Sequence, residues 1–162
     1  MKYVSTRGQA QPVSSAEAIK LGIAPDGGLF VPEEEVRLKS DELAAMRGMN
    51  YQERAVMVLT KFLTDFLEKE IKEYVDAAYS PERFDHPHVA PVARLDNSTY
   101  ILELWHGPTC AFKDMALQLL PHLLTASTRK TGEKAHIAVL VATSGDTGKA
   151  ALEGFKDVPG TS

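Results

Sequence analysis

ELWHGPTCAFKDMALQLLP, residues 103–121, is the stretch that decides the fold, and it carries a single lysine, Lys113. Its Gly-Pro pair favours a turn, after which a helix can begin. Apolar residues then recur at the spacing typical of a helix that packs on a core. They are Phe112, Met115, Ala116, Leu119, Leu120, Leu123 and Leu124. This spacing predicts a helix over residues 110–129, which Pro121 kinks or divides because proline lacks an N–H group.

The place of Lys113 near a predicted helix start bears on its chemistry. Backbone N–H groups converge at such a start, and the helix dipole is positive there. This setting disfavours an ammonium relative to the free amine, which suits a lysine that attacks a carbonyl carbon. The alternative is a solvated surface lysine, because most lysines in proteins are exposed.

Strand patterns flank this helix on both sides. Residues 91–95 and 99–104, PVARL and TYILEL, enclose an Asp-Asn pair and predict a hairpin or two short strands. The run AHIAVLVAT, residues 135–143, is continuously apolar and predicts a strand buried on both faces of a parallel sheet. A loop and a helix over residues 149–156 follow. The order strand, helix, strand, loop, helix predicts an α/β fold.

The loop TSGDTG, residues 143–148, lies between the predicted buried strand and the last helix. In open α/β sheets, ligands bind beyond the carboxyl ends of strands, where helix N-termini face the crevice. Ser144, Thr147 and the N–H groups made accessible by Gly145 and Gly148 could hold a carboxylate or phosphate. The alternative is a helix N-cap by Ser144, Asp146 or Thr147 without any ligand.

The first half of the chain has a different pattern. A short extended segment, a helix over residues 15–21 capped by Ser14 or Ser15, and a glycine turn in GIAPDGGLFVP come first. Two helices follow, one capped by Asn50 with Glu53 three residues on, the other over residues 67–79. Prolines then break the helical pattern. We therefore predict a mainly helical N-terminal domain with a short strand at residues 1–85 and an α/β domain from residue 86 to 162.

Composition excludes several classes of function. The net charge of -4 and the pI near 5.7 give no electrostatic reason to expect nucleic-acid binding. No apolar run approaches the roughly 20 residues that cross a bilayer, and no secretory signal opens the chain. The single cysteine, Cys110, indicates a reducing, cytoplasmic setting. His86 and His88 lack further ligands at metal-binding spacing, so we expect no metal.

Two pairs of motifs resemble one enzyme family. HGPTCAFKD is followed some thirty residues later by VATSGDTGKAALEGF, and the chain opens with YVSTRG and GIAPDGGLFVP. Together they closely resemble threonine synthase, a fold-type II pyridoxal-phosphate enzyme, from one end of the chain to the other. The resemblance implies a helical N-terminal region followed by the start of a three-layer αβα parallel-sheet domain, which is incomplete in this chain.

The resemblance also implies roles for single residues. In this family the lysine of the AFKD segment carries pyridoxal 5'-phosphate covalently, which maps to Lys113. Phe112 and Asp146 are the further cofactor-binding positions, although many relatives of this fold have asparagine where Asp146 stands. The loop after the strand holds the substrate carboxylate, which maps to Ser144, Gly145, Asp146, Thr147 and Gly148.

The implied reaction converts O-phospho-L-homoserine and water to L-threonine and phosphate, the last step of threonine biosynthesis. Lys113, as a neutral amine, would remove a Cα proton and then a Cβ proton. Which group contacts the substrate phosphate is left open, with Thr109 and Arg7 as candidates.

Several features predict that the chain is an N-terminal fragment. No second glycine-rich loop that could grip the cofactor phosphate occurs, and a buried parallel strand needs neighbours on both edges. We expect the fragment alone to be inactive, to bind the cofactor weakly or not at all, and to self-associate through exposed sheet edges. The alternatives to a threonine synthase are a non-catalytic module of the same fold and a related pyridoxal-phosphate-dependent phospho-lyase.

Overall fold

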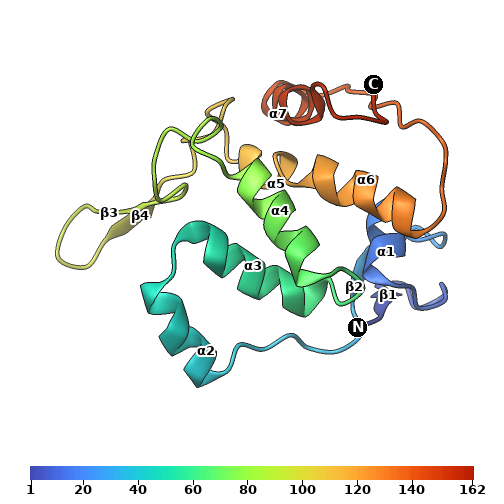
Figure 1. The fold of residues 1–162 in the computed structure, drawn as a ribbon, viewed down its shortest axis with the longest axis horizontal. Coiled ribbons are helices and arrows are strands. Elements are labelled where there is room, and N and C mark those ends of the chain that lie inside the picture. The colour runs from blue at the N-terminus through green and yellow to red at the C-terminus, as the bar shows by residue number, and fades with distance from the viewer. The chain divides into compact units, whose positions relative to one another are not determined.

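The computed structural model describes residues 1–162 and consists of helices with two small antiparallel sheets (Figure 1). The elements in chain order are β1 (Tyr3–Ser5), α1 (Ser15–Leu21), β2 (Phe30–Pro32), α2 (Ser40–Ala45), the 3-10 helix η1 (Met46–Gly48), α3 (Tyr51–Phe62), α4 (Glu68–Ala78), β3 (Val92–Arg94), β4 (Tyr100–Leu102), α5 (Asp114–Leu117), α6 (Leu120–Lys130) and α7 (Asp146–Phe155).

The chain forms two compact units, each made of two segments. The first unit contains residues 1–73 and 123–134, and the second contains residues 74–122 and 135–162. Helices α4 and α6 each begin in one unit and end in the other. The predicted domain boundary at residue 85 stays a prediction. Each compact unit combines two separate segments of the sequence, so the units do not correspond to one boundary along the chain.

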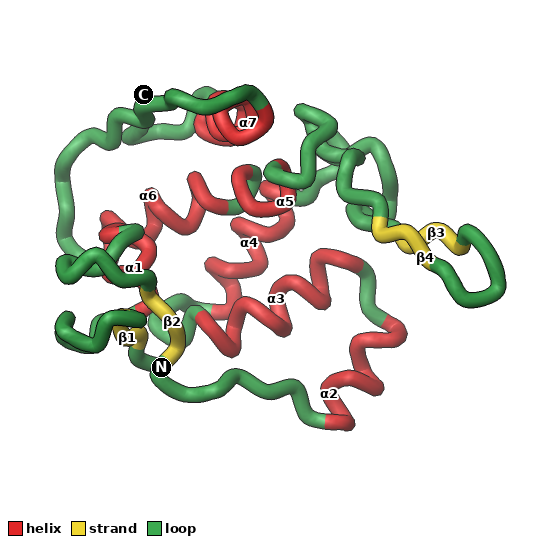
Figure 2. Tube along the Cα trace, turned by 180° about the vertical axis from the view of Figure 1, so that it is seen from behind, coloured by secondary structure: helices red, strands yellow, loops and turns green.

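In the first unit, β1 and β2 pair antiparallel, with Val4 opposite Val31 (Figure 2). Helix α1 has the predicted bounds, and Ser14 is its N-cap, accepting a 3.2 Å hydrogen bond from the Glu17 N–H group. The carboxylate of Asp65 also accepts from the N–H group of Ala16 at 2.9 Å. The predicted cap of α3 is confirmed as well, because Asn50 and Glu53 exchange two 2.8 Å hydrogen bonds.

The predicted glycine turn joins α1 to β2. Gly27 has φ of 78°, which glycine adopts without strain. A Cβ on Gly28 would lie 2.1 Å from the Ser5 hydroxyl oxygen, so this position also needs glycine. Asp26 accepts hydrogen bonds from Ser5 (2.6 Å) and from the Gly28 N–H group (2.9 Å), which hold the pKa of its carboxyl below the usual value. The turn is thereby tied to β1.

Helix α4 supplies much of the core. Ile71, Val75 and Ala78 are completely buried at the i, i+4, i+7 spacing of one helix face. Glu68, Lys69 and Glu73 lie on the exposed side. Near the end of the same helix, Tyr79 donates a 2.8 Å hydrogen bond to the Met115 carbonyl oxygen within the second unit.

The predicted hairpin of the second unit is confirmed. Strands β3 and β4 pair antiparallel, with Val92 opposite Leu102, and both of these side chains are exposed. The Asp96 carboxylate closes the turn by accepting 2.8 Å hydrogen bonds from the N–H groups of Ser98 and Thr99.

The helix predicted over residues 110–129 is two helices. Pro121 divides them as expected, because its ring conflicts with the carbonyl of Leu117 and it has no N–H to donate. The predicted start is wrong by four residues: α5 begins at Asp114. Cys110 has φ of 56°, which is outside the right-handed helical region, so a helix cannot begin there.

The strand predicted over residues 136–142 does not form in this structure. Ile137 makes one parallel bridge to Thr161, and Val139 donates a 2.7 Å hydrogen bond to the Ser162 carbonyl oxygen. The side chain of Leu140 is 94% exposed. A strand buried on both faces needs paired strands at both edges and helices above and below, and here only residues 160–162 pair with it.

We expect Ile71→Ala to lower the free energy of unfolding by about 2–5 kcal/mol, because it leaves a cavity at a fully buried position. Leu67→Ala, at a side chain that is 69% exposed one turn earlier, is the matched control and should change it far less. Urea unfolding followed by circular dichroism measures both. Equal losses in the two variants would contradict the assigned core.

Candidate active site

The turn before Lys113 is held by a buried carboxylate. Asp114 is 0% exposed, and its Oδ2 accepts a 2.8 Å hydrogen bond from the Thr109 N–H group. Its Oδ1 accepts a second bond of 2.8 Å from the Thr109 hydroxyl. Hydrogen bonds to an ionised acceptor are about twice as strong as neutral ones. Both donors of Thr109 are thus used inside the turn, which argues against Thr109 as a contact for substrate phosphate.

Glycine is required at the start of this turn. A Cβ on Gly107 would lie 2.6 Å from Cβ and Oδ2 of Asp114, closer than real Cβ contacts come. The Gly107 carbonyl oxygen also accepts a 3.1 Å hydrogen bond from the Cys110 N–H group. Residues 107–114 therefore form a closed loop with little freedom.

Lys113 immediately precedes α5 and is half-buried. Its carbonyl oxygen accepts a 2.9 Å hydrogen bond from the Leu117 N–H group, which starts the helix. Its Nζ lies 4.7 Å from the centre of the Phe112 ring, and no carboxylate forms an ion pair with it. The amine is therefore available for chemistry, and the adjoining aromatic ring is itself exposed.

His106 fixes the entry to the loop. Its Nε2 lies 2.8 Å from Glu103 Oε2, and its Nδ1 lies 2.7 Å from Asp85 Oδ1. Glu103 and then Asp85 hold the pKa of His106 above its ordinary value, because both carboxylates favour the imidazolium. The His106 carbonyl oxygen also accepts a 3.1 Å hydrogen bond from the Asp85 N–H group.

The second predicted segment, residues 143–148, leads into α7. Gly145 occupies the N-cap position of α7, and glycine has no side chain that could accept a hydrogen bond from the helix. Instead, the Thr143 hydroxyl oxygen accepts bonds from the N–H groups of Gly148 (2.9 Å) and Gly145 (3.3 Å). A Cβ on Gly148 would lie 2.7 Å from that oxygen, so glycine permits the close approach.

Capping of α7 by Ser144, Asp146 or Thr147 is therefore wrong, and the sequence interpretation missed Thr143. Thr143 lies two residues before the glycine at the N-cap. Its hydroxyl could have been predicted as the acceptor, because Ser and Thr hydroxyls accept hydrogen bonds from N–H groups a few residues later in the chain. The side chains of Ser144, Asp146 and Thr147 are exposed and accept no hydrogen bond within the chain. They remain accessible to a ligand.

Helices α5 and α7 pack closely in the second unit. A Cβ on Gly154 of α7 would lie 2.1 Å from the Leu117 carbonyl oxygen of α5. No hydrogen bond or ion pair joins Lys113 to residues 144–148 in this structure, so packing brings the two helices together without joining the two predicted parts of the site.

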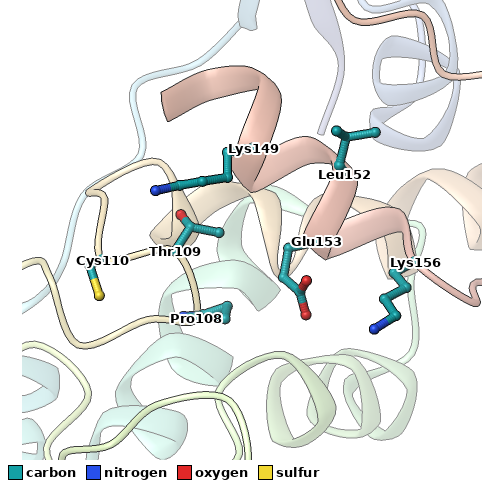
Figure 3. Close-up of a pocket in the computed structure, with 7 residues that line it drawn as sticks. All are labelled: Pro108, Thr109, Cys110, Lys149, Leu152, Glu153 and Lys156. Atoms are coloured by element: carbon teal, nitrogen blue, oxygen red, sulfur yellow. The ribbon is translucent and has the colours of Figure 1, made fainter. Parts of the chain in front are cut away.

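A pocket of about 590 Å³ lies beside the turn, between residues 108–110 and one face of α7. Figure 3 shows the Lys149 side chain extending towards the segment that carries Thr109 and Cys110. Its lining residues are Pro108, Thr109, Cys110, Lys149, Leu152, Glu153 and Lys156. Of the residues considered for the cofactor or the substrate, only Thr109, a candidate contact for the substrate phosphate, lines it.

Two properties of the chain bear on the class of site. The rings of His86 and His88 lie 5.5 Å apart, but no group of three or more His, Cys, Asp or Glu side chains is arranged to hold a metal ion. No helix of residues 1–162 has both the length and the apolar character required to span a bilayer.

Comparison with known proteins points to the threonine synthases. The family model described as the threonine synthase N terminus matches residues 2–79. Threonine synthase of Pseudomonas aeruginosa is 43% identical over 157 residues, which are 96% of this chain and 33% of that protein. The crystal structure of threonine synthase with bound PLP from Brucella melitensis matches 99% of this chain with a TM-score of 0.91 and 41% identity. Nearly the whole chain is therefore similar to the N-terminal part of threonine synthases.

The match to threonine synthases is confined to their N-terminal part. The chain covers 34% of the Brucella structure and 34% of the yeast threonine synthase structure, which it matches with a TM-score of 0.87. It therefore spans about a third of the length of the relatives it matches. The expected mixed helix and strand fold, incomplete relative to the family, is confirmed. The human protein named threonine synthase-like 2 is 41% identical over 94% of the chain.

We expect the free energy of unfolding to fall as pH rises above about 6.5, the ordinary histidine value, and through the raised pKa of folded His106. The imidazolium that Glu103 and Asp85 favour is present below that range and lost above it. His106→Gln should remove this part of the pH dependence, measured by urea unfolding between about pH 6.5 and 8.5.

His136→Gln, at an exposed histidine, is the control and should retain the pH profile of the parent. His122, whose pKa is lowered by burial and then by Arg83, is common to all three proteins, so its effect cancels in the comparison. An unchanged profile in His106→Gln would overturn the assignment.

Proposed function

We propose that the protein to which this chain belongs is a threonine synthase, which converts O-phospho-L-homoserine and water to L-threonine and phosphate with pyridoxal 5'-phosphate. The observation that carries this proposal is the match of nearly the whole chain to a threonine synthase solved with bound PLP. We further propose that the 162 residues alone are inactive, because they correspond to about a third of such enzymes.

Three features of this chain support the proposed cofactor site. Lys113 has an amine that no carboxylate neutralises, at the end of a turn fixed by Asp114 and Thr109. The exposed Phe112 ring offers an apolar wall beside that amine. At the start of α7, the first-turn N–H groups of Asp146 and Thr147 have no acceptor within the helix, which suits an anionic group.

When bound, pyridoxal phosphate supplies an electron sink for a carbanion at the substrate Cα. We propose that residues of this chain position the Lys113 amine and the carboxylate-binding loop around that carbon. Lys113 would hold the cofactor covalently through Nζ and, as a free amine, would take the Cα proton and then a Cβ proton of the substrate. After phosphate leaves Cγ, one proton would return to Cγ, water would add at Cβ, and a second proton would return to Cα, which balances the two protons that were taken.

The loop Ser144, Gly145, Asp146, Thr147 and Gly148 is proposed to hold the substrate carboxylate. Free N–H groups and two hydroxyls at the start of a ten-residue helix favour an anion, since the helix dipole is positive there. Asp146 is the position proposed to approach the cofactor's phenolic oxygen. The Thr143 bonds to Gly145 and Gly148 keep this loop in shape.

A related pyridoxal-phosphate-dependent phospho-lyase is the second candidate. Relatives named threonine synthase-like 2 from human and mouse are 41% and 39% identical to the chain, close to the identity with threonine synthases. Identity over the N-terminal third is therefore similar for proteins named threonine synthase and proteins named threonine synthase-like 2. A non-catalytic module of the same fold remains the alternative outside enzymes, and the cytoplasmic setting indicated by the single cysteine stays a prediction.

The activity can be tested in a hybrid, with residues 1–162 joined to the C-terminal two thirds of the Brucella melitensis enzyme. We expect phosphate release from O-phospho-L-homoserine, and a loss of about 10²–10⁴-fold in Lys113→Ala, the size of a general acid–base contribution. Lys134→Ala, at an exposed lysine, should keep the rate of the unaltered hybrid.

Retained activity in the Lys113→Ala hybrid would refute the assignment of the lysine. A hybrid that binds the cofactor, seen by its absorbance, but releases no phosphate would favour the second candidate. Absorbance that persists unchanged in Lys113→Ala would also refute covalent attachment at this residue.

We expect the 162-residue chain to self-associate. Leu140, Val92 and Leu102 expose apolar surface next to the open edges of residues 140–142 and of the hairpin, which favours edge-to-edge pairing. Sedimentation velocity over a range of concentrations should show dimers or larger species. A monomer at every concentration would contradict this, and tight binding of pyridoxal phosphate by the chain alone would contradict its proposed inactivity.

A further inference from the structure

We propose that Thr109 and Asp114 are positioning residues for Lys113, a role that rests on the proposed function. The two residues close the loop that ends at the lysine, and neither is among the groups proposed to touch the cofactor or the substrate.

The Lys113 side chain is not fixed by contacts of its own charged end. Its Nζ has one aromatic neighbour, Phe112, whose ring centre is 4.7 Å away and whose side chain is itself exposed. The direction in which the amine points therefore depends on the main chain at residue 113. That main chain is held on its C-terminal side by the 2.9 Å bond from the Leu117 N–H group to the Lys113 carbonyl oxygen.

On the N-terminal side, the Asp114 carboxylate restrains the main chain through its hydrogen bonds with Thr109. It does not serve α5 as a cap, since both of its oxygens accept from Thr109, five residues earlier, at 2.8 Å. A helix of four residues has few bonds of its own, so a fully buried carboxylate with two donors contributes much of the local order. Removing one donor leaves part of a buried charge unpaired.

Two further contacts lie next to this closure. Gly107 approaches Asp114 so closely that a Cβ would lie 2.6 Å from it, which leaves the loop little room to move. Tyr79 contacts α5 beyond the lysine, outside the loop, through its 2.8 Å bond to the Met115 carbonyl oxygen. The two bonds from Thr109 to Asp114 are therefore the side-chain hydrogen bonds that close the loop before Lys113.

The functional consequence concerns distance. An amine that bonds a carbonyl carbon and then moves two protons must reach each atom within a fraction of an ångström, and a 1 Å displacement can cost about 10²-fold in rate. A lysine next to an open loop loses that placement even when the protein stays folded.

The first test measures order at Lys113 in the 162-residue chain without cofactor. We expect the backbone order parameter of residue 113 by ¹⁵N relaxation to be near the rigid value of about 0.85 in the parent and in Thr109→Ser. It should fall towards about 0.6 in Thr109→Val, which keeps the side-chain shape and removes the hydroxyl donor. An unchanged order parameter in Thr109→Val would overturn the proposal.

Asp114→Asn extends the test, because the amide can still accept one bond from Thr109. It should give an intermediate order parameter, and if it does not fold, Thr109→Val still decides the outcome. Tyr79→Phe is the control for stability: it removes the bond to Met115 and should lower the unfolding midpoint while leaving the order at Lys113 as in the parent. Equal loss of order in Tyr79→Phe and Thr109→Val would show a merely structural role and overturn the proposal.

The second test uses the hybrid with the Brucella C-terminal part. Thr109→Val should lower kcat by about 10²-fold with KM within a factor of about three, and Thr109→Ser should restore it. A parental kcat in Thr109→Val would overturn positioning even if order is lost. If the unaltered hybrid has no activity, the proposed function fails, and the order parameters still decide whether Thr109 and Asp114 hold Lys113.

Discussion

The buried carboxylate of Asp114 is the constraint on which the centre of this structure depends. A carboxyl group without solvent needs hydrogen-bond partners, and Thr109 supplies two from within the same loop. The same loop contains Gly107, which has no room for a Cβ beside Asp114, and Cys110, which has a positive φ. Lys113 lies between this loop and the start of α5.

A different constraint acts at the C-terminal end of the chain. Residues 137–142 have the composition of a buried strand, yet only residues 160–162 pair with them, and Leu140 is almost fully exposed. Threonine synthases of known structure are about three times as long as this chain. The apolar run therefore has the composition of a buried strand without the paired neighbours on both edges that such a strand needs.

Local signals in the sequence predicted the local structure well. The caps of α1 and α3, the glycine turn at residues 27–28, the hairpin turn at Asp96 and the break at Pro121 all follow from interactions within a few residues. Predictions failed where several nearby residues could form the hydrogen bonds and the sequence pattern favoured the wrong ones. Thr143 rather than Ser144, Asp146 or Thr147 serves the start of α7, and Asp114 shortens the helix that apolar spacing alone extended to residue 110.

The sequence alone indicated the threonine synthase family and predicted roles for Lys113 and the loop at residues 143–148, because few other proteins share long motifs at this spacing. Tertiary structure alone decided how the lysine is held: a fully buried Asp114, a glycine with no room for a Cβ and a threonine with both donors occupied. The reason is physical. Burial and hydrogen-bond partnership depend on which groups meet in space, and no periodicity along the chain specifies that.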